Sequence, residues 1–459
     1  MPAPRLKPEV GFGPTYTEML HPEMLPSAIR QKALAARANE LDPINLFNIT
    51  WRAPDNSIRH IVLPKELTGV EANIIVLVGR EFPSGSHKVG PAYATLMEGE
   101  LGGEIHRGEN TIIGPSTGNF GIGVAYISKL MGYPALVIMP EQMSAERYQR
   151  IRQYGGKLDL TPGSESDVIL VLERTEEYKK DPRNKVLAQF ELLPNYRFHR
   201  HVTGGSALEA ARAYGNGQVA AFVAAPGSAG TLAAGDAIKA QFPDAVICAP
   251  EPRECSTLSN NGRGTHRIEG IGDKMVTLIH NVLTTDYVML IHDDDCVVGL
   301  ELLQQRQAFL EKLLKLRAGL LRPFDGVFGI SSVCNIMGAI RLARHLNLGP
   351  QDNVVTIATD GFDRYPSVLA DLAKRKPMTS DNALHDSFEA IFRGGSSADI
   401  LDVRLRQEKE RLFRYKQETW SKFGYSDSYL ESMKSQAFWE GEAARIPEFD
   451  AALLQARRS

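Results

Sequence analysis

Apolar runs bounded by turn residues recur along this chain and alternate with segments of helical length. Residues 72–78, 135–139 and 354–358 are almost entirely apolar. Short apolar runs between turn signals are typical of strands that are buried on both faces. Strands that alternate with helices form βαβ units. The pattern therefore predicts an α/β fold with mostly parallel sheets.

The remaining elements follow from the same patterns. Further strands are predicted at residues 111–113, 219–224, 245–249 and 327–330. Helices are predicted at residues 27–41, 89–100, 121–131, 144–154, 231–241 and 296–320. In the helix at 144–154, Ser144 is the expected N-cap, and Arg147 and Arg150 are expected on the polar side.

The length of 459 residues predicts two domains with appendages, since it is about three times the usual domain size. The strand–helix alternation loosens at 180–205, which suits a domain junction. We expect two open twisted sheets flanked by helices. The expected divisions are an N-terminal extension and crossover at 1–70, a smaller α/β domain at 71–203, a larger α/β domain at 204–400 and a helical tail at 401–459.

The tail carries aromatic residues within a charge-mixed sequence. They are Trp420, Phe423, Phe438 and Trp439. So many aromatic side chains are unusual for a purely solvated arm. We therefore expect the tail to pack against the body of the protein or against a second copy of the chain.

Composition excludes several classes of function. A hydrophobic content of 43% and a charged content of 23% match a soluble globular protein. The net charge of −3 gives no basic field for nucleic acid or an anionic membrane. Residues 1–6 lack the apolar core of a secretory signal, and no apolar run approaches the roughly 20 residues of a membrane span. These features predict a cytoplasmic protein.

Cysteines and acidic clusters give no metal site. Cys248, Cys255, Cys296 and Cys334 have no C-x-x-C spacing and suit reduced thiols. The run at 292–295 is His-Asp-Asp-Asp, but it directly precedes a predicted helix, where aspartates stabilise the first turn. We therefore predict no metal.

Three segments carry the chemistry that the sequence suggests. Lys88 lies between a glycine-containing turn and a helix, and a lysine that condenses with an aldehyde must be partly unprotonated. Ser116-Thr117-Gly118-Asn119 offers hydroxyls, an amide and N–H groups at a helix start. The segment 227–231, Gly-Ser-Ala-Gly-Thr, lies between a strand and a helix, where N–H groups can approach a phosphate.

Each segment alone has an ordinary structural interpretation. Lys88 could be a solvated residue at a helix start, 116–119 a capping turn, and 227–231 a common βα turn. The last is neither a Walker loop nor the G-x-G-x-x-G fingerprint, which weakens nucleotide alternatives. The order of the three segments along the chain nevertheless suits an enzyme that holds pyridoxal phosphate (PLP) through a lysine.

A longer set of motifs resembles one family. Residues 139–147, Met-Pro-Glu-Gln-Met-Ser-Ala-Glu-Arg, are similar to the MPE-x-MS-x-ER segment of fold-type II PLP enzymes of the cysteine synthase and cystathionine β-synthase family. Further similarities lie at 155–163, Gly270-Ile271-Gly272, 329–332 and Asp360-Gly361. The resemblance covers about residues 82–369.

The resemblance implies site residues as well as a cofactor. It makes Lys88 the Schiff-base lysine, Asn119 the partner of the ring hydroxyl and Ser331 the partner of the pyridine nitrogen. A serine at that nitrogen favours loss of a β-substituent over a long-lived carbanion. The phosphate loop would be Gly227, Ser228, Ala229, Gly230 and Thr231, and the carboxylate loop Ser116, Thr117 and Gly118.

Three departures from the family concern substrate choice. Phe120 replaces a hydroxyl residue and is expected to shape which amino acid is accepted. Ser228-Ala229 changes the common G-x-G-G-T loop, and Ser86-His87-Lys88 is closer to the lysine segment of tryptophan synthase β chains.

The implied reaction is β-replacement or β-elimination on an activated serine- or cysteine-type L-amino acid, through an aminoacrylate intermediate. The alternatives are a serine/threonine dehydratase-like deaminase and, in another class, a non-catalytic PLP-binding homologue. Expected partners are the amino-acid substrate and a second copy of the chain in a homodimer.

Overall fold

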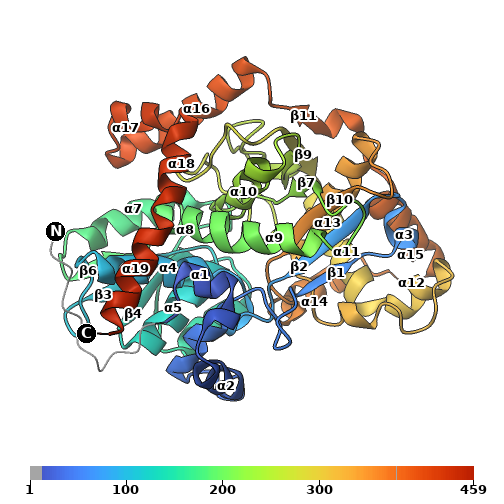
Figure 1. Ribbon diagram of the computed structural model, residues 1–459. Helices are drawn as coiled ribbons and strands as arrows, with labels where there is room; N and C mark the ends of the chain where they lie inside the picture. Colours follow the sequence, from blue (N-terminus) through green and yellow to red (C-terminus); the bar gives the residue numbers. More distant parts are fainter. Residues whose placement is uncertain (1–12, 379, 459) are drawn as a thin grey trace.

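The computed structural model describes residues 13–378 and 380–458 and contains two sheets covered by helices (Figure 1). No helix within these residues is both long enough and apolar enough to cross a bilayer. The expected absence of a secretory segment rests on residues 1–6, which lie outside the described part of the chain.

Among the described residues, the larger sheet has seven strands in the order β1-β2-β10-β7-β8-β9-β11. The two edge strands, β1 and β11, are antiparallel to their neighbours, and the five strands between them are parallel. Their bounds are β1 His60–Val62, β2 Asn73–Val78, β7 Val219–Val223, β8 Val246–Pro252, β9 Tyr287–Ile291, β10 Asn353–Ala358 and β11 Ile400–Asp402.

The smaller sheet is parallel and, in the same part of the chain, has four strands in the order β5-β4-β3-β6. Their bounds are β3 Thr111–Pro115, β4 Ala135–Pro140, β5 Lys157–Thr161 and β6 Asn184–Val186. The α/β fold with two helix-flanked sheets, expected from the sequence, is confirmed.

The strand β2 differs from the expected domain division. It was placed in the smaller domain at 71–203, but it pairs with β10 in the larger sheet. Its alternate side chains enter different cores: Ile75 and Leu77 lie in one, Ile74 and Val76 in the other. Burial on both faces explains the continuous apolar run but does not reveal which sheet receives it.

Helices cover both sheets. Around the smaller sheet lie α4 Val89–Leu101, α5 Asn119–Met131, α6 Ala145–Gln153, α7 Val168–Lys179 and α8 Leu193–Phe198. Against the larger sheet or its outer layer lie α9 Gly204–Ala211, α10 Ala233–Gln241, α11 Asp293–Gln305, α12 Gln307–Leu313, α13 Ile330–His345, α14 Pro366–Arg375 and α15 Asp381–Phe388. From residue 13 to Lys88 the α-helices are α1 Tyr16–Leu20, α2 Ser27–Ala36 and α3 Lys65–Thr68.

Two expected elements were wrong. The single helix at 296–320 is divided into α11 and α12 at Arg306, which has non-helical dihedral angles. After α12, the chain folds back, and Glu311 accepts hydrogen bonds from the N–H groups of Gly319 and Leu321. The expected strand at 327–330 is a buried apolar segment that leads directly into α13, so its hydrophobicity reflects burial rather than pairing.

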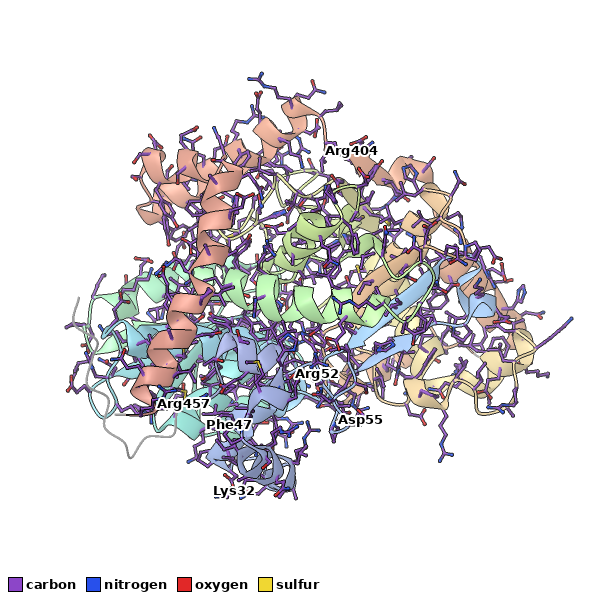
Figure 2. All side chains as sticks on the ribbon, viewed as in Figure 1. Lys32, Phe47, Arg52, Asp55, Arg404 and Arg457 are labelled. Atoms are coloured by element: carbon purple, nitrogen blue, oxygen red, sulfur yellow. The ribbon has the colours of Figure 1, made fainter. Side chains whose placement is uncertain are left out.

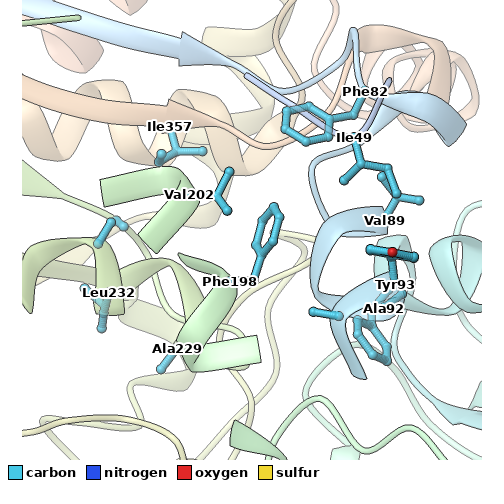
Figure 3. Packing of buried hydrophobic residues seen from close by; sticks show 14 of the residues in the cluster. Ile49, Phe82, Val89, Ala92, Tyr93, Phe198, Val202, Ala229, Leu232 and Ile357 are labelled. Atoms are coloured by element: carbon cyan, nitrogen blue, oxygen red, sulfur yellow. The ribbon is translucent and has the colours of Figure 1, made fainter. Parts of the chain in front are cut away.

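One of the apolar cores contains side chains from both sheets. It includes Val89 from α4, Phe198 from α8 and Leu232 from the start of the α10 region. Figure 3 shows these side chains with others of the same cluster, with Phe198 lying between Val89 and Leu232 in the view. Because this core contains residues from both halves, the elements on either side of the space between the sheets are packed firmly against each other.

The tail packs on the body, as its aromatic residues led us to expect. It consists of α16 Arg406–Trp420, α17 Asp427–Ser432, α18 Gln436–Ala444 and α19 Ile446–Ala456. In Figure 1, α16 and α17 lie at the top of the molecule, and α18 and α19 run down over the body. Asp450 accepts hydrogen bonds from the Tyr16 and Thr17 N–H groups at 2.8 and 3.1 Å. Arg457 lies over the Phe47 ring at 5.4 Å, beside α2 (Figure 2).

Candidate active site

Lys88 lies immediately before α4, with its amine buried between the two sheets. Its Nζ donates to Ser228 Oγ at 3.2 Å and to Gln189 Oε1 at 3.5 Å. Burial lowers the pKa of Lys88 to about 8, although the nearby Asp273 and Glu165 carboxyls act in the opposite direction. A larger fraction of this amine is therefore neutral near neutral pH than of an ordinary lysine, which is the form that attacks an aldehyde.

The segment 116–119 forms a tight turn at the start of α5. Ser116 Oγ accepts hydrogen bonds from the N–H groups of Gly118 and Gly121 at 3.0 and 2.8 Å. Thr117 donates its hydroxyl to the buried Glu165 carboxylate. The hydroxyls thus fix the shape of the turn.

Asn119 joins this turn to the end of β10. Its Nδ2 donates to Asp360 at 2.6 Å, and the Tyr365 hydroxyl donates to the same Asp360 oxygen at 2.8 Å. Asn119 Oδ1 has no hydrogen-bond partner among the described residues. The amide is therefore oriented by Asp360, with its carbonyl oxygen left over as a buried acceptor.

Residues 227–231 form the turn between β7 and α10. A side chain at Gly227 would lie 2.5 Å from the Gly270 carbonyl oxygen, and one at Gly230 would lie 2.2 Å from Asn195 Oδ1. Ala229 adopts the left-handed region at φ 63°, and Thr231 lies in the turn that leads into α10. Ser228 Oγ accepts a hydrogen bond from Lys88 Nζ, so this turn lies beside the lysine amine.

Ser331 is the second residue of α13, and its side chain is buried. The residue before this helix, Gly329, approaches Asp360 so closely that an added Cβ would lie 2.0 Å from Oδ1. The start of α13 therefore lies against the Asp360 network that orients Asn119.

Phe120 follows Asn119 in α5 and is 1% exposed within the core that contains side chains from both sheets. Its ring packs in this core directly after the 116–119 turn. A contact with substrate stays a prediction.

Sequence reasoning missed several buried polar residues around this turn. Arg147 was expected on a polar face but is fully buried; it forms an ion pair with Glu269 at 2.5 Å and donates to Tyr365 at 3.0 Å. Its guanidinium lies where a side chain on Gly118 would be. Ser144, the expected cap, instead donates its hydroxyl to Glu269 at 3.0 Å. The repeated helix pattern of α6 gave no sign of this, because it depends on contacts with distant residues.

His87 is a second buried group that the pattern did not reveal. It stacks on Trp51 at 5.6 Å and meets His199 edge-on at 5.1 Å. Burial lowers the pKa of His87 to about 3, with a further contribution from Lys88. The ring is therefore neutral beside the amine.

The 292–295 run has a structural role. Asp293, Asp294 and Asp295 occupy the first turn of α11, and Arg267 binds Asp293 at 3.0 Å. Within residues 13–378 and 380–458, no group of three or more His, Cys, Asp or Glu side chains is arranged to hold a metal ion.

The site fits PLP. The buried Lys88 amine, the unpaired Asn119 carbonyl oxygen and the close-approach glycines of 227–231 offer an amine, an acceptor and a phosphate cradle. They come from both sheets and meet at the carboxyl ends of parallel strands, which is where ligands bind in open α/β sheets.

The chain belongs to the pyridoxal-phosphate dependent enzyme family, whose model matches residues 78–360. It is thus a PLP-dependent enzyme of fold type II. It is 32% identical to a cysteine synthase of Staphylococcus aureus over 324 residues, which are 70% of this chain and 95% of the relative.

Solved structures agree with this assignment. A hydrogen sulfide-producing enzyme of Fusobacterium nucleatum is 28% identical, with a TM-score of 0.56, covering 72% of this chain and 92% of the relative. An O-acetylserine dependent cystathionine β-synthase of Helicobacter pylori is 25% identical, with a TM-score of 0.57, covering 67% and 94%. The tail lies beyond the region that the family model matches.

Proposed function

We propose that this enzyme replaces or eliminates the β-substituent of an activated serine- or cysteine-type L-amino acid. The observation that carries the proposal is the buried Lys88 amine, which is hydrogen-bonded to Ser228 in the 227–231 turn and precedes α4, a helix that packs against α5. The similarity to a cysteine synthase over 95% of that relative supports the same reaction class.

Each predicted residue has a role in this proposal. Lys88 Nζ would carry the covalent link to the cofactor, and the free Lys88 amine would take the proton from the substrate Cα. The backbone N–H groups of 227–231 and the Thr231 hydroxyl hold the phosphate, aided by the start of α10. When bound, PLP supplies the electron sink that lets the β-substituent leave.

The remaining residues orient the two ligands. Asn119 Oδ1 would accept from the cofactor's ring hydroxyl, and Ser331 would be the partner of its pyridine nitrogen. The turn of Ser116, Thr117 and Gly118 would hold the substrate carboxylate at the start of α5, where the Ser116 hydroxyl keeps its proton to donate. Phe120 tunes substrate choice from behind this turn. We further propose that the enzyme is a cytoplasmic homodimer, with the smaller domain starting after β2.

The test of covalent chemistry is Lys88→Ala. It should abolish borohydride-fixed PLP at residue 88 and lower turnover by about 10²–10⁴-fold or more, since both the link and the proton transfer are lost. Peptide mass spectrometry locates the adduct. The exposed Lys129 provides the matched control, and Lys129→Ala should behave as wild type. An adduct that persists on another lysine would contradict the assignment.

Product analysis separates the possible reactions. Formation of a new thioether from O-acetylserine and a thiol indicates β-replacement. Pyruvate and ammonia formed without a thiol indicate elimination, and 2-oxobutyrate from threonine would indicate the dehydratase alternative. PLP binding with no turnover of any of these amino acids would overturn the proposed function.

A further inference from the structure

Asp273 is a buried carboxylate at the site that none of the roles above uses. Its side chain is 3% exposed, and neither oxygen accepts a hydrogen bond from a described residue. An unpaired carboxylate in such a place is costly for the fold, so it needs another explanation. Glu165 and Asp360 are also buried near Lys88, but each has an oxygen engaged by a neighbouring side chain.

The backbone holds Asp273 firmly beside the 227–231 turn. Gly270 and Gly272 have φ angles of 97° and 78°, which favour glycine, and the Gly272 N–H donates to the Pro226 carbonyl at 3.0 Å. The Gly270 carbonyl packs against Gly227. Asp273 also lines a small cavity with Gly227 and Ala229. The backbone at Asp273 is therefore held in place, while its side-chain carboxylate accepts no hydrogen bond from a described residue.

The tail supports the segment that follows Asp273. The Trp420 indole N–H donates to the Val276 carbonyl at 2.9 Å, and Thr277 donates to the Ser228 carbonyl at 2.8 Å. The adjacent Lys274 points elsewhere, to Asp167 at 2.8 Å. Among the described residues, Asp273 is free of such an ion pair, and Lys88 is the charged group that acts on it electrostatically.

Asp273 can exist in both protonation states near neutral pH. Burial raises the pKa of Asp273 to about 7, although the Lys88 cation acts in the opposite direction. The titratable groups that interact with it or line the same cavity are Lys88, Glu165, Cys255, Glu251 and His280. Burial raises the pKa of the Glu165, Cys255 and Glu251 groups and lowers that of His280. Lys88 is therefore the principal cation facing the carboxylate.

We propose that Asp273 is the acid–base residue for the β-substituent, so that the enzyme acts on amino acids whose substituent is a hydroxyl or thiol. When the bond from Cβ to the substituent breaks, the electron pair goes to the substituent and the Asp273 carboxyl proton follows. Water or a neutral thiol departs, and a carboxylate remains. In the replacement reaction the sulfur of an incoming thiol bonds to Cβ, and the Cα=Cβ double bond becomes single as Lys88 returns a proton to Cα. The thiol proton goes to the Asp273 carboxylate, which restores the acid.

The proposal rests on the proposed function and narrows its substrate class. A hydroxyl or thiol is a poor leaving group that benefits from protonation, whereas acetate leaves as a stable anion. The residue is thus expected to matter for serine and cysteine and to matter little for O-acetylserine.

The experiment compares the holoenzyme with Asp273→Asn, Asp273→Glu and Lys274→Gln. With cysteine or serine, Asp273→Asn should lower kcat/KM by about 10²–10³-fold. With O-acetylserine, the loss should stay below about threefold, because acetate leaves unprotonated. Asp273→Glu should restore part of the lost activity, and the neighbouring control Lys274→Gln should match wild type.

Two readouts are independent of turnover. Exchange of the substrate Cα proton with deuterated solvent reports on Lys88 and should persist in Asp273→Asn. Infrared difference spectroscopy of the holoenzyme should show a carboxyl band that titrates near neutral pH and disappears in the same variant. In wild type, kcat/KM for cysteine should fall as the carboxyl ionises, and Asp273→Asn should lose this limb.

The outcomes separate the two proposals. Equal losses on cysteine and O-acetylserine, or loss of Cα exchange, would mean that Asp273 is structural and would overturn its role. A wild-type enzyme with PLP but neither Cα exchange nor turnover would overturn the proposed function and the role of Asp273 with it. If Glu165→Gln, rather than Asp273→Asn, produced the selective loss, the acid would be Glu165.

Discussion

The active-site region and the C-terminal tail both bury polar groups, but these groups are hydrogen-bonded in the tail and partly unpaired at the site. At the site, Asn119 Oδ1 and both Asp273 oxygens have no hydrogen-bond partner among the described residues. In the tail, the buried Lys416 amine donates to the carbonyls of Leu278 and His280 at 2.9 and 2.6 Å. The Trp420 and Trp439 indoles also donate to carbonyls.

This difference indicates that the active-site region binds ligands, whereas the tail stabilises the fold. A paired buried group stabilises one structure, whereas an unpaired group costs free energy until a ligand satisfies it. The tail is therefore a scaffold for the segment 276–280, and the site keeps its unused acceptors and donors for ligands. The comparison predicts that changes in the tail act mainly on stability and changes at the site mainly on binding.

Removing the tail after residue 400 should have the largest effect. The deletion exposes the core that Trp420, Trp439 and Leu430 complete against Phe190 and Leu278. We expect the melting temperature to fall by more than about 5 °C, since a loss of 1 kcal/mol corresponds to about 2–4 °C in a larger domain. Differential scanning calorimetry measures this, and the exposed Leu454→Ala is the control. An unchanged melting temperature and activity would make the tail a mobile appendage.

Gly230→Asp should weaken the cofactor while sparing the fold. The new side chain would meet Asn195 at the proposed phosphate cradle and bring a carboxylate toward the phosphate dianion. We expect PLP affinity to fall by about 10- to 100-fold, which corresponds to about 1.4–2.7 kcal/mol. Absorbance titration of PLP into the protein measures it. Gly441 in α18 has open space around it, so Gly441→Asp should change neither affinity nor circular dichroism.

Much of the fold could be predicted because local patterns determine it. The runs at 72–78 and 354–358 became strands, and the helices after Lys88 and Asn119 begin within two residues of their expected starts. The division at Arg306 could not be predicted, because the apolar spacing continues across it. Likewise, the sequence could not predict to which sheet β2 belongs, since a strand that is buried on both faces has the same apolar pattern in either sheet.

The site residues also fall into those that the sequence could reveal and those that it could not. Lys88, Asn119 and the 227–231 turn have local signatures of glycines and helix starts. Arg147 and Glu165 do not, because their importance arises from tertiary contacts with Glu269 and Thr117. Asp273 directly follows a Gly-Ile-Gly motif, which was the one available signal, but its unpaired state depends on three-dimensional packing.

Lys416→Met should change the pH dependence of stability. Burial lowers the pKa of Lys416 from 10.5 to about 7. Between these values the unfolded chain binds more protons at this residue than the folded chain, so its contribution to stability rises with pH. The variant should lose this slope and, because two carbonyls lose their donor, about 1–3 kcal/mol of stability at high pH. Urea unfolding from pH 7 to 10 measures both; a slope identical to wild type would contradict the assignment.

Phe120→Leu should give the smallest effect and sharpen the comparison most. Phe120 lies at the site, beside Asn119, yet it is packed like a tail residue, without an unpaired polar atom to offer. A volume change of this kind costs less than about 1.5 kcal/mol, so the fold should survive. If the ring fixes the carboxylate turn, a small displacement should alter the ranking of kcat/KM among O-acetylserine, cysteine, serine and threonine by about threefold, the size of a weakened hydrogen bond. Val124→Ala in the same helix is the control for core loosening, and it should lower the melting temperature without changing the ranking. A ranking equally unaffected by Phe120→Leu would show that core packing at this position does not reach the substrate.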